Sequence, residues 1–381
     1  MSQNYLGKEI KKLGFGFMRL PLLEDSQEID IEQSKKMVDL YLEKGYTYFD
    51  TAVGYLGQRS EIALKTCLTD RYPRESYQIA TKMSAHFIED DLPPEKMFQR
   101  SLERIGVDYV DFYLLHAMNR INYEKYKEVG AFSLLQKLKS QGKIKHYGLS
   151  FHDRADALEM ILEAHPDIEF VQLQLNYADW ENPGIQSRKC YEVAQKYKKP
   201  VVVMEPVRGG MLTRLPEAAV ETFQKAKPED SLAKWALGYV AQLDNVITIL
   251  SGMSSLAQVE ENCTTFDQME PFTKADFETI DKVMEIMNAL PNIPCTECDY
   301  CVKDCPSKIN IPLMFRIMNV HLRYDKEGAV ASNRGNFNFN TKGMPLPSAC
   351  IACQKCEKTC PQGINIIEQL VRVKETYEEN L

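Results

Sequence analysis

The sequence predicts an α/β fold, a (β/α)8 TIM barrel followed by a small, mainly helical domain. Up to about residue 290 the chain repeats one unit, in which a short apolar, β-rich run precedes a longer stretch with helical periodicity. Eight such runs, and a length close to the ~250 residues of a typical barrel, favour this fold. After residue 290 the composition changes, because eight of the eleven cysteines lie there.

The eight expected strands are separated mostly by helical stretches, such as those at 31–45 and 133–143. An open doubly wound sheet shares this alternation and is the alternative, although no GxGxxG follows the first strand. The runs are LGFGFMRL (13–20), YTYFD (46–50), YQIATK (77–82), YVDFYLLH (109–116), KHYGLS (145–150), FVQLQLN (170–176), PVVVMEP (200–206) and NVITILSG (245–252).

A domain boundary is expected near residue 291, where PNIPCTECDYCVKDCPSKINIP begins a cysteine-rich region. The stretch IPLMFRIMNVHLRYD (311–325) predicts one amphipathic helix, and INIIEQLVRVKETYEEN (364–380) predicts another. Between them, the polar, Gly- and Asn-rich segment SNRGNFNFNTKGMP (332–345) leads to the second cysteine run. We therefore assign residues 1–290 to the barrel and 291–381 to the second domain.

Charge and hydropathy exclude some classes of binding partner and indicate a cellular location. The 381 residues carry a formal net charge of -8, so no basic excess exists to bind nucleic acid or an anionic membrane. The N-terminal MSQNYLGKEIKK lacks an apolar core before a small-residue cleavage site, and no apolar stretch approaches the roughly 20 residues that span a bilayer. We therefore expect a cytoplasmic protein. The sequence does not indicate an oligomeric state.

The last quarter of the chain contains the spacing C-x2-C-x2-C-x3-C-P twice. The first three cysteines of such a motif bind one [4Fe-4S] cluster, while the fourth ligates the other cluster. This spacing predicts two clusters whose ligands cross between the motifs. A zinc site and disulfides are the alternatives, although zinc needs only four ligands and disulfides are rare in the cytosol. The predicted sets are Cys295, Cys298, Cys301 and Cys360, and Cys350, Cys353, Cys356 and Cys305.

This region resembles the two-cluster bacterial ferredoxin domain, and the resemblance covers only the C-terminal quarter of the chain. The long insert between the two motifs, which carries a predicted helix, departs from the short ferredoxin loop. In this respect the region is similar to helical ferredoxin variants.

Ionisable side chains close three consecutive strands of the predicted barrel, at the ends where barrel active sites lie. Asp50, Lys82 and His116 are the last residues of their runs, and Tyr55 follows Asp50 in the adjoining loop. Reduction of a carbonyl by hydride leaves an alkoxide, which a tyrosine can protonate if a nearby ammonium lowers its pKa. We therefore expect Tyr55 to be the acid, Lys82 to lower its pKa, Asp50 to hold Lys82, and His116 to orient the carbonyl oxygen.

Residues 1–290 resemble the aldo-keto reductase family. The matching stretches are GYTYFDTAVGY, IATKM, DYVDFYLLH, GKIKHYGLS, VQLQLNY, EPVRGGML and SGMSSLAQVEEN. The resemblance places the family's catalytic tetrad on Asp50, Tyr55, Lys82 and His116 without substitution. It implies NAD(P)H-dependent interconversion of a small aldehyde or ketone and the alcohol.

The resemblance also implies NADP(H) bound across the barrel mouth without a Rossmann domain. Gly252 and Gln258 stand where many members have a cation for the 2′-phosphate, so NAD remains an alternative to NADP. Met204 stands in place of a tyrosine that often stacks on nicotinamide, Phe151 replaces an asparagine that usually binds the carboxamide, and Ala117 replaces an aromatic that often lines the substrate pocket. The implied cofactor residues are Arg19, Ser150, Gln172, Met204, Gly210, Ser254, Gln258, Glu261 and Asn262.

The remaining aromatic and histidine residues give weaker signals. Trp180 lies just after the sixth expected strand, where it could line the substrate or belong to local packing. The histidines other than His116, among them His152, do not group with carboxylates at ligand spacing, so we expect structural or surface roles.

Two functions follow. The favoured one is a carbonyl oxidoreductase that carries two [4Fe-4S] clusters and exchanges electrons with a ferredoxin or another carrier. Clusters move single electrons whereas nicotinamide releases two, and a flavin could bridge them, although the sequence has no flavin motif. The alternative is an electron-transfer or redox-sensing protein, in which the barrel only binds nucleotide and the clusters are regulatory or structural.

Overall fold

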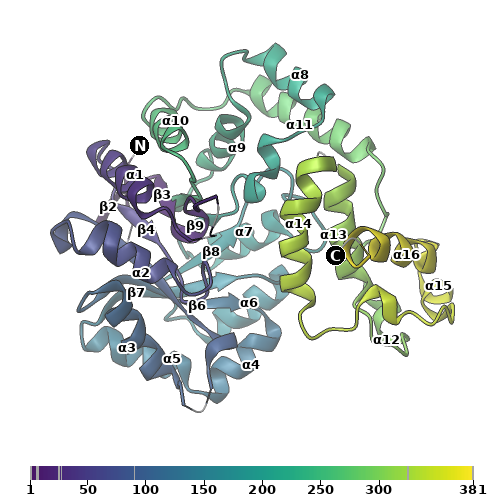
Figure 1. Cartoon of the computed structure of the whole chain (residues 1–381), viewed down its shortest axis with the longest axis horizontal. Helices are drawn as coiled ribbons and strands as arrows, with labels where there is room; N and C mark the ends of the chain where they lie inside the picture. The colour runs from purple at the N-terminus through teal and green to yellow at the C-terminus, as the bar shows by residue number, and fades with distance from the viewer. Residues whose placement is uncertain are drawn as a thin grey trace. The chain divides into compact units, whose positions relative to one another are not determined.

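Eight parallel strands close into a barrel in the order β10-β3-β4-β5-β6-β7-β8-β9 (Figure 1). Each strand overlaps one of the eight expected runs, so the barrel prediction is confirmed and the open-sheet alternative is wrong. An antiparallel hairpin of two short strands precedes the barrel and was not predicted. The hairpin strands are β1 (Ser2–Tyr5) and β2 (Lys8–Lys11), and the barrel strands are β3 (Leu13–Gly16), β4 (Tyr48–Asp50), β5 (Gln78–Ser84), β6 (Val110–Met118), β7 (Ile144–Phe151), β8 (Phe170–Gln174), β9 (Val201–Met204) and β10 (Val246–Ser251).

The chain forms two compact units. The first consists of residues 1–209 and 233–272 and contains the barrel, and the second consists of residues 210–232 and 273–381. The expected domain boundary near residue 291 differs from this division and stays a prediction. The computed structural model describes residues 2–5, 8–24, 26, 28–89, 91–323 and 326–379.

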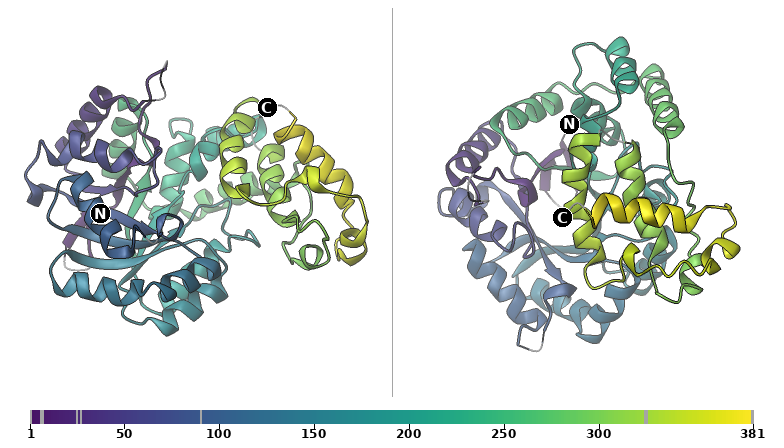
Figure 2. Two further views of the ribbon diagram at one scale, coloured as in Figure 1. Left: turned by 60° about the horizontal axis from the view of Figure 1, so that its bottom comes forward. Right: turned by 45° about the vertical axis from the view of Figure 1, so that its right-hand side comes forward.

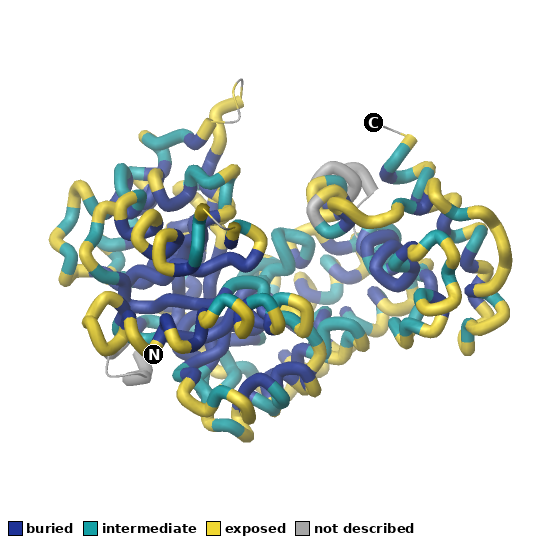
Figure 3. Tube along the Cα trace, turned by 90° about the horizontal axis from the view of Figure 1, so that it is seen from below, coloured by how far each residue is buried: buried dark blue, intermediate teal, exposed yellow. Residues whose placement is uncertain are grey.

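Apolar side chains fill both faces of the barrel strands, which Figure 3 shows as buried. Inside the barrel, the ring of Phe112 lies between those of Tyr48 and Phe170, with centroid distances of 5.2 and 5.4 Å. Outside it, alternate residues such as Phe49 and Leu173 belong to the layer between strands and helices. Because both faces are buried, each strand appears in the sequence as a nearly continuous run of apolar residues.

Helices cover the outside of the barrel (Figure 2), and the expected helices at 31–45 and 133–143 match α1 and α5. The carboxylate of Asp30 caps α1 by accepting a hydrogen bond from the backbone nitrogen of Gln33 at 2.9 Å. No helix in the described ranges is long and apolar enough to cross a membrane. The helices are α1 (Ile31–Glu43), α2 (Ser60–Leu64), α3 (Pro94–Ile105), α4 (Arg120–Glu128), α5 (Ala131–Ser140), α6 (Ala155–Ala164), α7 (Ser187–Lys196), α9 (Leu232–Ala241) and α10 (Leu256–Asp267).

The second unit is helical and has its own apolar core, in which Phe315, Val373 and Tyr377 are almost fully buried. The helices expected at 311–325 and 364–380 are present as α13 and α16, and residues 324, 325 and 380 of these expectations lie outside the described residues. The unit contains α8 (Glu217–Ala226), α11 (Lys274–Ala289), α12 (Tyr300–Lys303), α13 (Ile311–Arg323), α14 (Lys326–Thr341), α15 (Lys355–Thr359) and α16 (Ile366–Tyr377).

Most of the polar segment 332–345 is helical, because it forms the end of α14. Asn333, Phe337 and Thr341 are buried and lie four residues apart, so they share one face of the helix. The side-chain nitrogen of Asn333 donates to the Tyr377 hydroxyl at 3.1 Å, and the ring of Phe337 stacks on that of Tyr377 at 4.9 Å. The sequence did not predict this helix because the segment is polar. Its buried face contains two polar residues, and both make hydrogen bonds.

The packing of β7 against β8 provides a test of the barrel. A Cβ atom at Gly148 would lie 2.4 Å from the backbone oxygen of Phe170, whereas a Cβ at Gly335 in α14 would meet no atom within 4 Å. We expect Gly148→Ala to lower the free energy of unfolding by about 1–3 kcal/mol, because neighbouring backbone must move. Gly335→Ala is the control and should be neutral or stabilising by up to ~1 kcal/mol. Urea denaturation followed by circular dichroism measures both, and equal midpoints for the two variants would contradict this packing.

Candidate active site and cysteine clusters

A buried ion pair lies at the carboxyl ends of β4 and β5. The Nζ atom of Lys82 is 2.6 Å from Oδ1 of Asp50 and also donates to the backbone oxygen of Thr51 at 2.8 Å. The Lys82 side chain is fully buried and that of Asp50 is 3% exposed. The two strands pair in parallel with Asp50 opposite Ala80, so both side chains reach the same end of the barrel.

Tyr55 and His116 complete the group expected from the sequence. The Lys82 Nζ atom lies 4.9 Å from the centre of the Tyr55 ring. The rings of Tyr55 and His116 meet edge to face with centroids 5.7 Å apart. The backbone oxygen of His116 accepts a hydrogen bond from the Tyr126 hydroxyl at 2.8 Å, which holds this end of β6. The fold therefore brings the four predicted catalytic side chains together.

The pKa values in this group follow from burial and from one positive charge. Burial raises the pKa of Tyr55, and Lys82 acts in the opposite direction without overcoming it. Burial also acts to lower the pKa of Lys82, but Asp50 and Tyr55 outweigh it and raise that pKa, so the ammonium stays charged. Burial and Lys82 hold the pKa of His116 well below its usual value, so its imidazole is neutral near pH 7. The sequence led us to expect that Lys82 brings the pKa of Tyr55 toward neutrality. Lys82 does act to lower this pKa, but burial raises it by more.

Three of the expected cofactor residues meet at the ends of β7, β8 and β9. The Sδ atom of Met204 lies 3.8 Å from Oγ of Ser150 and 3.4 Å from Nε2 of Gln172. Gln172 is buried, and its Oε1 atom has no hydrogen-bond partner in the part of the chain that the structure describes. An unsatisfied buried acceptor of this kind fits an amide N–H such as that of a nicotinamide carboxamide.

A second group of expected cofactor residues lies after β10. Ser254 donates its hydroxyl hydrogen to the backbone oxygen of Arg19 at 2.7 Å, and its backbone nitrogen donates to Oε1 of Gln258 at 2.7 Å. The side chain of Asn262 is buried and donates to Ser251 at 3.0 Å, whereas Glu261 is exposed. Gly210 belongs to the second unit.

The Arg19 side chain lies beside two glycines. A Cβ atom added at Gly252 would lie 3.2 Å from Cδ of Arg19, and one added at Gly209 would lie 2.9 Å from its Nη2. These glycines follow β10 and β9, so their lack of a side chain leaves room for the guanidinium between the two loops.

Two residues near the tetrad were missed. His152 lies 3.2 Å from the Ser150 hydroxyl through its Nε2 atom, and its charge contributes to the lowered pKa of His116. Glu205, the residue after β9, has a φ of 57°, which is uncommon for a residue with a side chain, and its pKa is raised by burial while Arg19 opposes the shift. His152 follows Ser150 by two residues and so shares its side of the strand, which the sequence did show.

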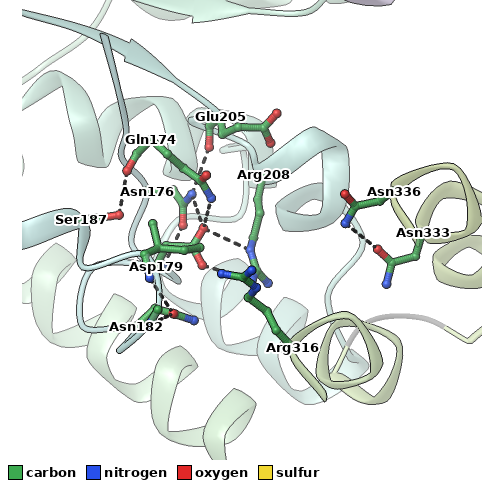
Figure 4. Close-up of polar contacts among 12 residues, drawn as sticks. Gln174, Asn176, Asp179, Asn182, Ser187, Glu205, Arg208, Arg316, Asn333 and Asn336 are labelled. Atoms are coloured by element: carbon green, nitrogen blue, oxygen red, sulfur yellow. Dashed lines mark hydrogen bonds and ion pairs between the residues drawn. The ribbon is translucent and has the colours of Figure 1, made fainter. Parts of the chain in front are cut away.

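A polar network fixes the segment after β8 against the segment after β9 (Figure 4). The buried Oδ2 atom of Asp179 accepts hydrogen bonds from Nε2 of Gln174 at 2.9 Å, Nδ2 of Asn176 at 2.9 Å and Nε of Arg208 at 3.1 Å. Asn176 also donates to the backbone oxygen of Glu205 at 3.0 Å. The network therefore holds the strained backbone at Glu205.

The backbone next to His116 is irregular. Ala117 has a φ of 52°, and the pairing of β6 with β7 shifts in register between Leu115 and Met118. Irregularities of this kind commonly redirect side chains next to active sites.

Trp180 packs edge to face on Tyr239 with ring centroids 5.7 Å apart, which favours its interpretation as local packing.

One cavity in the second unit is lined by four cysteines from both motifs, and these are the members of the first predicted set. The rest of its lining is largely apolar and includes Phe315. No three His, Cys, Asp or Glu side chains in the described ranges are grouped as the ligands of one metal ion. The four cysteines of the cavity are Cys295, Cys298, Cys301 and Cys360.

The two motifs share their backbone conformation. Glu297 and Asp299 in the first motif have φ values of 54° and 64°, and Ala352 and Gln354, at the same two positions of the second, have 52° and 60°. In the second motif, burial raises the pKa of Cys356 to about 11, with a smaller contribution from nearby Cys350. The repeated loop conformation supports the same ligand role for both motifs, whereas the membership of Cys305 in the second set stays a prediction.

The buried ion pair makes a prediction about stability. Lys82→Met would leave the Asp50 carboxylate buried without its partner, so we expect a loss of about 3–5 kcal/mol in the free energy of unfolding. Adding Asp50→Asn to Lys82→Met removes that charge and should recover part of the loss. Urea denaturation of the two single variants and the double variant gives the coupling free energy, and additive effects would contradict a direct interaction.

Comparison with known proteins identifies both regions. Residues 12–285 match the model of the aldo/keto reductase family, and residues 294–365 match a 4Fe-4S dicluster domain. The chain is 26% identical over 317 residues to L-galactose dehydrogenase of Arabidopsis thaliana, covering 75% of this chain and 93% of that protein. It superposes on an aldo-keto reductase of Bacillus halodurans with a TM-score of 0.57 and 25% identity, over 74% of this chain and 96% of the other. A Klebsiella pneumoniae aldo-keto reductase in complex with NADPH shares the fold, with a TM-score of 0.60, 17% identity and coverage of 74% and 95%. The chain belongs to the aldo/keto reductase family and carries a 4Fe-4S dicluster domain after its barrel.

Proposed function

We propose that this chain is an NAD(P)H-dependent oxidoreductase that interconverts an aldehyde or ketone and the corresponding alcohol at Asp50, Tyr55, Lys82 and His116. The observation that carries the proposal is the position of the Lys82 ammonium, 2.6 Å from the Asp50 carboxylate and 4.9 Å from the centre of the Tyr55 ring. A phenol beside a buried ammonium can release a proton because the phenolate that forms is stabilised by the positive charge.

Each side chain has one part in the reaction. When bound, the nicotinamide cofactor supplies or accepts the hydride. In reduction, Tyr55 gives its hydroxyl proton to the substrate oxygen, and Lys82, held by Asp50, stabilises the phenolate. His116 is neutral, so it donates a hydrogen bond to the same oxygen without competing as an acid. In oxidation, the Tyr55 phenolate accepts the proton of the alcohol.

We assign the nicotinamide end of the cofactor to Ser150, Gln172 and Met204, which contact one another at the ends of three adjacent strands. The unsatisfied Oε1 atom of Gln172 supports this assignment. We assign the rest of the cofactor to the remaining predicted residues, with Arg19 toward its nicotinamide side and Glu261 and Asn262 near its adenine. Gly252 and Gln258 offer no cation for a 2′-phosphate. The remaining predicted residues are Arg19, Gly210, Ser254, Gln258, Glu261 and Asn262. The assignment accommodates NADP or NAD.

The second unit would hold two [4Fe-4S] clusters on the eight cysteines of its motifs. The cavity lined by Cys295, Cys298, Cys301 and Cys360 supports the crossed assignment, because the last of these belongs to the other motif. We propose that the clusters exchange single electrons with a ferredoxin or another small carrier. Because hydride carries two electrons, coupling to the barrel requires a group that divides them, such as a flavin.

A structural role for the clusters is a second candidate. Cys301 and Cys356 are each 7% exposed and belong to the apolar core of the second unit. Cluster assembly would then contribute free energy of folding, and the barrel would act as a nucleotide-binding module of a redox sensor.

The catalytic assignment is tested by Tyr55→Phe, which removes only the hydroxyl group. We expect carbonyl-dependent NADPH oxidation to fall by roughly 100- to 10,000-fold, because a positioned acid contributes about that much. Tyr197→Phe is the matched control, since the Tyr197 hydroxyl donates to Glu163 on the outside of the barrel at 2.6 Å. The dissociation constant for NADPH should not change in either variant, and full activity in Tyr55→Phe would rule out the mechanism.

The cluster assignment is tested by metal analysis of protein purified without oxygen. Two clusters correspond to about eight iron atoms per chain, and Cys360→Ser should lose about half of them. Cys190→Ser is the control because Cys190 is a buried cysteine of α7 in the first unit. Four iron atoms in the unmodified protein, or no loss in Cys360→Ser, would contradict the assignment. Circular dichroism of the same variant separates the two roles, since a lost helical signal supports a structural cluster.

A further inference from the structure

His152 brings a second imidazole to the catalytic end of the barrel. It follows β7, where Phe151 is buried among the outer layer, and successive side chains of a strand point to opposite faces. Ser150 and His152 therefore share the other face, and the Nε2 atom of His152 lies 3.2 Å from the Ser150 hydroxyl. The backbone nitrogen of His152 donates to the oxygen of Met118 at 2.8 Å, which fixes it beside the end of β6.

The reaction centre lies within electrostatic reach of this imidazole. Burial and the charge of Lys82 lower the pKa of His152 to about 4, and His152 in turn contributes to the lowered pKa of His116. Part of the His152 side chain is nevertheless exposed to solvent, so a substrate can reach it from that side. Both imidazoles are neutral near pH 7, and each then has one N–H donor and one acceptor nitrogen.

The two imidazoles are positioned for different roles in substrate binding. His116 contacts the ring of Tyr55 and is assigned to the reacting oxygen. His152 directly follows the neighbouring strand β7, and the residue after His116 is Ala117, which has only a methyl side chain. A neutral group that both donates and accepts matches a hydroxyl, whereas it offers no charge to balance a carboxylate or phosphate.

We propose that His152 binds a hydroxyl group next to the reacting carbonyl, so that the site selects hydroxyaldehydes and hydroxyketones. The inference rests on the proposed carbonyl chemistry and adds a substrate class and a specificity residue to it. Ser150 holds the His152 ring through their hydrogen bond, which leaves the other ring nitrogen, Nδ1, as the group that meets substrate.

The test compares hydroxyacetone with butanone, two ketones of similar size in which a hydroxyl replaces a methyl group. We expect the unmodified protein to prefer hydroxyacetone in kcat/KM, and His152→Ala to reduce that preference about 10-fold, as the loss of one hydrogen bond implies. His152→Asn keeps a donor and an acceptor and should retain part of the preference. His146→Gln is the matched control, because His146 lies earlier on β7 and pairs with Glu169 at 2.9 Å.

A second measurement does not depend on turnover. Calorimetric titration of NADPH-loaded Tyr55→Phe protein with each ketone should show the same preference, and addition of His152→Ala should remove it. An unchanged preference in both measurements would overturn the role of His152 and leave the proposed function intact. A weaker affinity for NADPH in His152→Ala, with equal losses for both ketones, would overturn it in favour of cofactor binding. Full activity in Tyr55→Phe, together with a binding preference that His152→Ala removes, would contradict only the proposed function.

Discussion

The salt bridge between Lys82 and Asp50 is the interaction on which the candidate active site depends. A buried ammonium is costly unless a carboxylate and hydrogen-bond acceptors surround it, and here the Asp50 carboxylate and the Thr51 carbonyl both do so within 2.8 Å. The pair forms only if β4 and β5 lie side by side in the observed register. The closed barrel thus fixes the position of the charge, and the charge then sets the protonation of the groups around it.

The same ammonium explains why two histidines near it are neutral. A positive charge on His116 or His152 would be repelled by Lys82 in an environment that already disfavours ions, so both pKa values fall. Tyr55 is affected in the opposite way, since a negative charge on its oxygen would be attracted by Lys82, yet burial keeps its pKa raised. The site therefore contains one cation whose charge the Asp50 carboxylate balances, one phenol that can lose a proton to a developing alkoxide, and two neutral hydrogen-bonding rings. Such a set suits a neutral polar substrate better than an anionic one.

Much of the barrel could be predicted from the sequence because parallel strands buried on both faces leave continuous apolar runs, as in PVVVMEP. The position of the predicted tetrad could be inferred because its ionisable residues end consecutive strands, whose carboxyl ends meet at one side of a barrel. His152 follows Ser150 by two residues and Glu205 belongs to the run PVVVMEP, but these positions alone do not indicate a role, because the importance of both residues comes from tertiary contacts with Ser150 and Arg19. The end of α14 was missed for a related reason, since the buried Asn333 has its hydrogen-bond acceptors on Ile317 and Tyr377, which are distant in sequence.

The two cysteine motifs show how a repeated sequence imposes a repeated backbone. Left-handed conformations cost free energy for residues with a side chain, yet Glu297, Asp299, Ala352 and Gln354 adopt them at equivalent positions in loops that have different sequences. A cost incurred twice at the same places indicates a shared requirement, and the binding of a cluster by the cysteines of each loop would supply it. The cavity that includes Cys360 with the cysteines of the first motif extends this argument from the single loop to the pair. With the ligands crossed as we propose, each loop would depend on the other motif for its fourth ligand, so the two halves of the motif region would assemble together rather than one after the other.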